Sequence, residues 1–178
     1  MSRTTIVTAA VLAALAATAA PTPATADDIS YQNHVVESTP PDGAGESISL
    51  DVPADWERDT LNWHTAGFFD YIEQPRSIVV DLEPLVNTVR EARAEARVLR
   101  ELGRRYYREF AFKVNEPGSR VRARWVFAYR DAPTDDTWSY TGVFLMKGNR
   151  LVIDGRLAHK EELQQIRRHV VRSVEFLR

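Results

Sequence analysis

The sequence predicts an α+β fold in which an antiparallel β-sheet packs against two main helices. Three observations lead to this class. Several short runs alternate between apolar and polar residues, two longer segments repeat apolar residues every three or four positions, and Pro and Gly residues separate these segments. The expected order is roughly β-β-β-α-β-β-β-α. The chain has no cysteine, so its core alone must hold it, and a domain of about 150 residues buries about 70% of its unfolded surface.

The first 26 residues have the pattern of a signal peptide. Arg3 precedes an apolar run from Ile6 to Ala20, and Ala24-Thr25-Ala26 forms a small-residue cleavage site. The apolar run has 15 residues, fewer than the about 20 that a membrane-spanning helix needs. Without cysteine there is no atom to carry a lipoprotein anchor. We therefore expect a secreted chain, cleaved after Ala26, that is not a lipoprotein and keeps no transmembrane segment.

The composition argues against a polycation. Without residues 1–26 the chain has 22 Lys and Arg against 25 Asp and Glu, a net charge of −3, so no nucleic acid is expected as its partner. The preference for Arg over Lys is typical of high-GC bacteria such as actinobacteria. Residues 27–45 contain few apolar anchors and predict a flexible lead-in, followed by a single domain over residues 46–178.

The elements before the first helix are expected to be strands. Ile48, Leu50 and Val52 alternate with polar residues, and Pro53 ends this run. Short apolar and aromatic runs at residues 68–72 and 78–82 predict two further strands, which Gln74-Pro75 separates.

An amphipathic helix is predicted from about residue 85 to residue 110, because apolar residues recur there every three or four positions. Three strands follow at about residues 121–129, 138–146 and 151–157, the last two joined by a turn at Gly148-Asn149. A closing helix is expected from residue 161 to about residue 174.

This order resembles that of the PsbP-like family. The resemblance is carried by four segments: the opening Ser47 to Trp56, Phe68-Phe69-Asp70 with Pro75 and Ile78-Val79-Val80, Arg124 to Tyr129, and Arg172 to Phe176. It covers about residues 46 to 178. It implies an α/β/α sandwich and binding without catalysis, and it assigns no functional residue. The long Arg-rich helix departs from the shorter helix of the family.

A basic stripe on the first helix is the main candidate site. Six arginines recur there every three or four residues: Arg90, Arg93, Arg97, Arg100, Arg104 and Arg108. On one helix they fall within an arc of about 80°. Like charges at such spacing destabilise a helix by a few tenths of a kcal/mol unless an anion compensates them. The last five are the tentative site for an anionic cell-envelope polymer or an acidic protein, and a solvated helix face is the alternative.

Two further groups of residues have two interpretations each. Arg120, Arg122 and Arg124 alternate along one strand, as in a charge-paired sheet face or a groove for an anionic ligand. Trp63, His64 and Phe68 are either a tentative aromatic binding site or part of the core.

Catalysis, cofactors and metals are not indicated. The four histidines, His34, His64, His159 and His169, have no metal-binding spacing, and no phosphate loop or Gly-x-Ser-x-Gly motif occurs. We expect a non-enzymatic binding protein without cofactors. Two alternatives remain open: a secreted hydrolase that uses a carboxylate pair such as Asp70 and Glu73, and a module that forms homo-oligomers through exposed sheet edges.

Overall fold

A computed structural model gives the fold of residues 29–39, 45–71, 75–84, 86, 88–132, 134 and 136–177. The predicted leader, residues 1–26, lies outside the described residues. The strands and helices are, in chain order, β1 (Tyr31–Glu37), β2 (Ser47–Pro53), β3 (Glu57–Asn62), β4 (Thr65–Asp70), β5 (Arg76–Asp81), α1 (Val89–Glu101), β6 (Tyr107–Val114), β7 (Ala123–Tyr129), β8 (Ser139–Leu145), β9 (Arg150–Arg156), the 3₁₀ turn η2 (Leu157–His159), α2 (Lys160–Ser173) and β10 (Glu175–Leu177).

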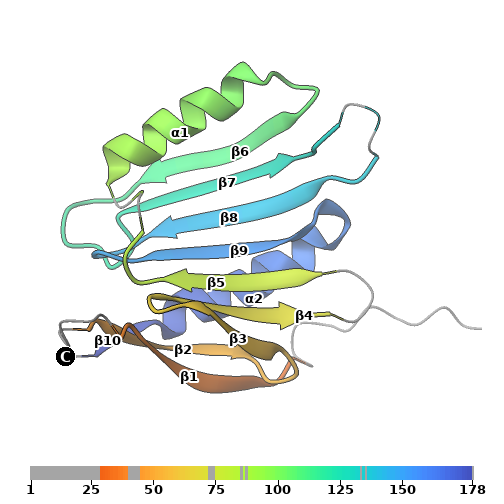
Figure 1. Ribbon diagram of the computed structural model, residues 1–178. Coiled ribbons are helices and arrows are strands. Elements are labelled where there is room, and N and C mark those ends of the chain that lie inside the picture. Colours follow the sequence, from red (N-terminus) through yellow and green to blue (C-terminus); the bar gives the residue numbers. More distant parts are fainter. Residues whose placement is uncertain are drawn as a thin grey trace, which may run out of the picture.

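The predicted α+β class is confirmed. Seven strands form one antiparallel sheet in the order β3-β4-β5-β9-β8-β7-β6, and three form a small sheet in the order β1-β2-β10. Figure 1 shows α1 beside β6 at one end of the large sheet, and α2 behind β9 and β5. Because α2 packs against both β2 and β9, it lies between the two sheets. None of the described helices is long and apolar enough to cross a membrane.

The two faces of the large sheet carry separate cores. On β7, Trp125 and Phe127 pack with Ala92 and Ala96 of α1, whereas Val126 belongs to the larger core that α2 completes. This division follows from the alternation of side chains along a strand. A fully buried large side chain contributes about 1.5–3 kcal/mol relative to an exposed one, so these two clusters supply most of the driving force for folding.

The prediction of a flexible lead-in is wrong for residues 31–37. These residues form β1, which pairs with β2 so that Val36 lies opposite Ile48. Val36 is the only buried residue of β1, so the strand has little of the apolar pattern by which sequence analysis finds strands. Strand β3 was not predicted for the same reason, since all six of its residues are exposed.

The predicted helix is too long at both ends. Thr88 caps α1 and accepts a hydrogen bond from the backbone N–H of Glu91, whose side chain accepts in return from the N–H of Thr88, a capping box. After Glu101 the chain turns at Gly103, whose φ of 77° suits glycine and stops a helix. The residues from Tyr107 onward form β6 instead.

The later predictions agree better with the structure. Strands β7, β8 and β9 lie within or close to the expected ranges, and the turn between β8 and β9 contains Gly148 with a φ of 80°. Helix α2 begins one residue before the expected start and ends at Ser173. The chain then adds the short strand β10, which pairs with β2. In the described part of the chain, five strands precede α1 instead of three, four follow it, and one follows α2.

Candidate functional site

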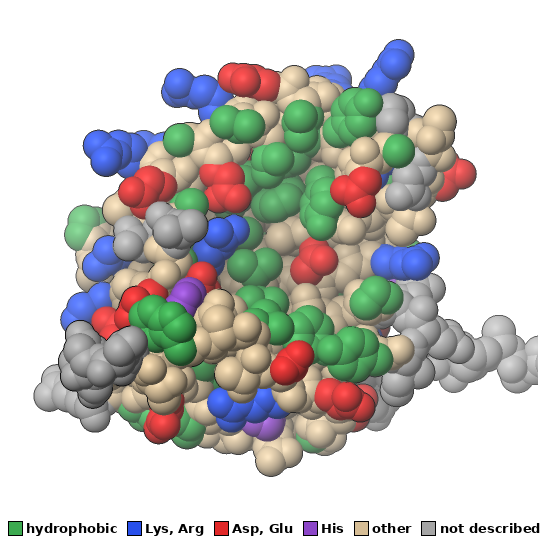
Figure 2. Space-filling view, in the orientation of Figure 1, with side chains coloured by type: hydrophobic (Ala, Val, Ile, Leu, Met, Phe, Trp, Pro, Cys, Tyr) green, Lys and Arg blue, Asp and Glu red, His purple; other side chains and the backbone are tan. Residues whose placement is uncertain are grey.

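The predicted basic stripe is not one continuous surface. Because α1 ends at Glu101, only Arg90, Arg93, Arg97 and Arg100 lie on the helix, while Arg104 lies in the following turn and Arg108 on β6. In Figure 2 the cations above the sheet, where Figure 1 places α1, point outward and are separated by acidic side chains. They do not line a hollow in this view.

Arg100 already has an acidic partner. Its guanidinium donates to both carboxylate oxygens of Glu109 on β6, at 2.7 to 3.0 Å. Glu109 also accepts from Tyr107, whose hydroxyl accepts from the indole N–H of Trp125 at 2.8 Å. Arg100 therefore completes a network that reaches the core. Arg100, Arg104 and Arg108 line an open depression of about 530 Å³, but Glu109 shares it and reduces its positive charge.

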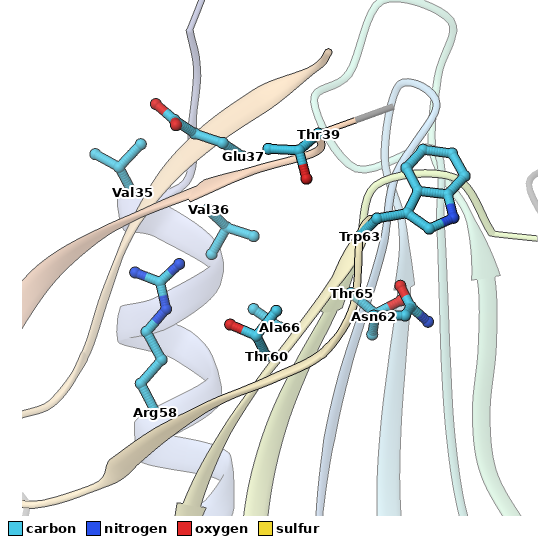
Figure 3. Close-up of a pocket in the computed structure, with 10 residues that line it drawn as sticks. All are labelled: Val35, Val36, Glu37, Thr39, Arg58, Thr60, Asn62, Trp63, Thr65 and Ala66. Carbon is cyan, nitrogen blue, oxygen red and sulfur yellow. The ribbon is translucent and has the colours of Figure 1, made fainter. Parts of the chain in front are cut away.

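The predicted aromatic site is divided between core and surface. Phe68 is fully buried, so it is not accessible to a ligand at the surface. Trp63 is 42% exposed, and His64 beside it lies 2.8 Å from a carboxylate oxygen of Asp81. Figure 3 shows the pocket of about 400 Å³ between β1 and β3, in which Trp63 lies at one end and Arg58 at the other. Neither His64 nor Phe68 lines it.

The carboxylate pair of the hydrolase alternative is not assembled in the described part of the chain. Asp70 forms an ion pair with Arg76, which also contacts Glu162 of α2, and Glu73 lies outside the described residues. Among the described residues no group of three or more His, Asp or Glu side chains could hold a metal ion.

Several cations gather on the face of the large sheet that α2 covers. There, a groove between α2 and strands β6 and β7 encloses about 230 Å³. Five cations line it: Lys113, Arg124, Arg167, Arg168 and Arg172. We call these five residues the basic groove. The nine described residues of its lining include no Asp or Glu, and none of the five cations forms a salt bridge with a described carboxylate.

Strands β6 and β7 place two of these cations side by side. Lys113 lies directly opposite Arg124, and like charges at such positions destabilise a sheet. The Nε of Arg124 is buried and has no hydrogen-bond partner among the described residues. A buried donor without a partner costs about 1–3 kcal/mol, so the fold holds Arg124 here at a cost to its stability.

Helix α2 supplies the other side of the groove. The guanidinium of Arg167 donates to the hydroxyl of Tyr140 at 3.2 Å and lies 5.9 Å from the ring centroid of Phe144. The stem of Arg167 packs close to Gly142 of β8, since a β-carbon built there would lie 3.5 Å from the arginine Cδ, an ordinary van der Waals contact. Burial lowers the pKa of Arg167, and the positive charge of Arg124 lowers it further. Arginine nevertheless stays protonated in proteins, so the groove keeps its charge.

The dipole of α2 explains the position of only some of these cations. Arg172 lies in the last turn of α2, where the helix dipole favours cations, and Arg120 donates to its carbonyl oxygen at 3.0 Å. This accounts for Arg172 and Arg120 without a ligand. It does not account for Lys113 and Arg124 on the sheet or for Arg167 on α2. These three cations line the same cavity and repel one another.

Sequence analysis found one residue of this groove. Arg124 belongs to the alternating arginines for which an anion-binding groove was one of two interpretations, whereas Arg122 is exposed and does not line the cavity. Arg168 and Arg172 are four residues apart in the closing helix, and Arg167 directly precedes Arg168. That spacing was visible in the sequence, but nothing in it showed that this side of α2 faces β6 and β7.

Comparisons with known proteins do not assign a family. No protein-family model and no curated protein matches this chain. Among solved structures the chain is similar to that of cyanobacterial PsbP from Synechocystis sp. PCC 6803, at 15% identity and a TM-score of 0.48 over 84% of this chain and 94% of that chain. Membership of the PsbP-like family therefore stays a prediction, and the α+β class rests on the strands and helices described above.

Proposed function

We propose that this protein is a non-catalytic binding domain whose basic groove holds an anionic group of the phosphate type. The observation that carries the proposal is the convergence of Lys113, Arg124 and Arg167 on one cavity without an acidic partner in its described lining. Arg124 lines this cavity, and its buried Nε has no hydrogen-bond partner among the described residues.

A phosphate fits the number of donors better than a carboxylate does. A carboxylate offers two oxygens and one negative charge, whereas a phosphate monoester offers three terminal oxygens and nearly two charges. Arginine binds such groups through two parallel N–H donors, which the planar guanidinium presents in a fixed geometry. Four of the five cations in the basic groove are arginines.

The described lining of the groove favours binding over catalysis. It consists of Lys, Arg, Asn, Val and Phe side chains and includes no carboxylate or imidazole. Such a set supplies no general base. We also propose that the protein acts outside the cytoplasm, where an anionic envelope component would be its partner. The signal-peptide pattern of residues 1–26 supports this location.

Calorimetric titration with pyrophosphate tests the proposed site. The groove variant is Arg124→Gln with Arg167→Gln. Its control is Arg93→Gln with Arg97→Gln, which removes the same charge from the exposed face of α1. A hydrogen bond to a charged group contributes about 1.5–3 kcal/mol, so the groove variant should lose at least about 100-fold in affinity. The control should change it by less than about threefold, because exposed charges are screened.

The measurement is repeated at low and high salt. Binding should weaken with added salt, because salt screens the attraction between pyrophosphate and the cations of the groove. Equal losses in the two variants would show that general charge and not the groove binds the anion. No binding by the folded wild-type protein at low salt would refute the proposal.

A further inference from the structure

A second group of cations and aromatic rings lies near the first residue of α2, whereas the basic groove lies near the end of this helix. Arg108 of β6 lies with its guanidinium carbon 4.1 Å from the ring centroid of Trp138. Lys160, the first residue of α2, lies with its Nζ 4.6 Å from the ring centroid of Phe110. We call Arg108, Phe110, Trp138 and Lys160 the distal cluster. A cation on an aromatic face keeps N–H donors for a further acceptor.

The two groups lie on the same face of the sheet. Arg108 and Lys113 are opposite Ala128 and Arg124 of β7, and positions 124 and 128 point to one side because they are four residues apart. On α2, Lys160, Gln164 and Arg167 follow one another at spacings of four and three, so they form one stripe along the helix.

Tyr140 connects the basic groove with the distal cluster. Its ring centroid lies 5.7 Å from that of Phe110, and its hydroxyl accepts from Gln164 at 3.3 Å and from Arg167 at 3.2 Å. Side chains that contact one another therefore line the surface between Lys160 and Arg167, and aromatic rings lie between the cations.

The length of this path exceeds that of a single small anion. From Lys160 to Arg172 the helix rises about 18 Å at 1.5 Å per residue. Arg108 and Lys113 of β6 lie opposite Ala128 and Arg124, which are four residues apart on β7, so they are separated by about 13 Å at 3.3 Å per residue. Both walls thus carry cations over a similar distance, and one phosphate cannot reach both ends.

We propose that the ligand is a linear polymer with repeated phosphate groups, which lies along α2 from the distal cluster to the basic groove. This inference rests on the proposed function, because it takes the basic groove as the first binding point. Binding one phosphate group in the basic groove brings groups further along the polymer within reach of Arg108 and Lys160, so each further contact raises the effective affinity.

A chain-length series tests the inference. Pyrophosphate, tripolyphosphate and a long-chain inorganic polyphosphate are titrated into the wild-type protein and into the Arg108→Gln, Lys160→Gln variant. The wild-type affinity should rise by at least about tenfold from pyrophosphate to the long chain, once corrected for the number of sites along the chain. The distal variant should lose about tenfold or more for the long chain and stay within about twofold for pyrophosphate.

The other possible outcomes distinguish failure of this inference from failure of the proposed function. If pyrophosphate binds the groove but affinity does not grow with chain length, or the distal variant binds the long chain as wild type does, the inference is wrong and the proposed function stands. If pyrophosphate does not bind at all, the proposed function fails with it. A poly-glutamate chain that binds as tightly as polyphosphate would overturn the phosphate assignment in favour of an acidic polypeptide. Thermal unfolding of each variant shows whether it is folded.

Discussion

Replacing Arg124 by Met should stabilise the protein in the absence of anions, although it removes part of the binding site. The change removes a buried donor that has no hydrogen-bond partner among the described residues. It also removes repulsion from Lys113, the cross-strand neighbour of Arg124. Such a donor costs about 1–3 kcal/mol, and the partial exposure of Arg124 places the gain near the lower end, at about 1 kcal/mol. Met keeps an unbranched apolar stem of similar shape.

The assay is thermal unfolding followed by circular dichroism at low salt, with and without pyrophosphate. A gain of about 1 kcal/mol raises the Tm by about 2–4 °C for a chain of this size. With saturating pyrophosphate the order should reverse, because a ligand stabilises only the protein that binds it. Arg97→Met on the exposed face of α1 is the control and should shift stability by less than about 0.5 kcal/mol. A lower Tm for Arg124→Met without anions would refute the reasoning.

Three further predictions concern the fold around the site. Tyr107→Phe should cost about 1–3 kcal/mol in urea unfolding, since the indole N–H of Trp125 loses its acceptor, and an unchanged midpoint would contradict the network. Burial raises the pKa of Asp154, so the folded state binds that proton more tightly and wild-type stability falls as pH rises above the unfolded pKa of about 3.9. Asp154→Asn should therefore be more stable than wild type near neutral pH and lose this advantage in acid; a constant difference across pH would argue against it. Gly155→Ala should lower stability by about 1–3 kcal/mol, because its β-carbon would lie 2.9 Å from a methyl carbon of Leu163, and an unchanged Tm would contradict this contact between β9 and α2.

Elements with a buried face could be predicted from the sequence, and elements without one could not. Strands β7, β8 and β9 alternate between two cores, so their apolar pattern is visible without a structure. Strand β3 exposes every residue and forms only through its pairing with β4. Its residues Glu57, Arg58 and Asp59 place charges along an edge of the sheet, where they oppose pairing with another chain.

The end of α1 shows how a periodic pattern can extend past its helix. Tyr106 and Phe110 continue the spacing of three and four, and this favoured a longer helix. Two local signals pointed to the observed bounds. Thr88 and Glu91 form a capping box, and Gly103 takes the left-handed conformation that ends a helix. Once the chain turns at Gly103, Arg108 lies on a strand and the predicted stripe is divided.

The candidate site depends on contacts between distant segments, which spacing alone does not give. Lys113 and Arg124 are neighbours only because β6 pairs with β7 in one register, and Arg167 joins them because α2 crosses the same face. In the Arg-rich segment that the sequence predicted as the main site, Arg100 instead forms an ion pair with Glu109. Local charge density in the sequence led to the prediction of an anionic partner, whereas tertiary contacts decide which cations share a cavity.

The most direct test of the central claim is an NMR titration of the arginine side-chain Nε–H signals with pyrophosphate. The account predicts that the signal of Arg124 shifts most, followed by that of Arg167, while those of Arg93 and Arg97 on α1 move little. Larger shifts on α1 than in the basic groove, or no saturable shift at Arg124, would contradict the claim that this groove is the anion-binding site.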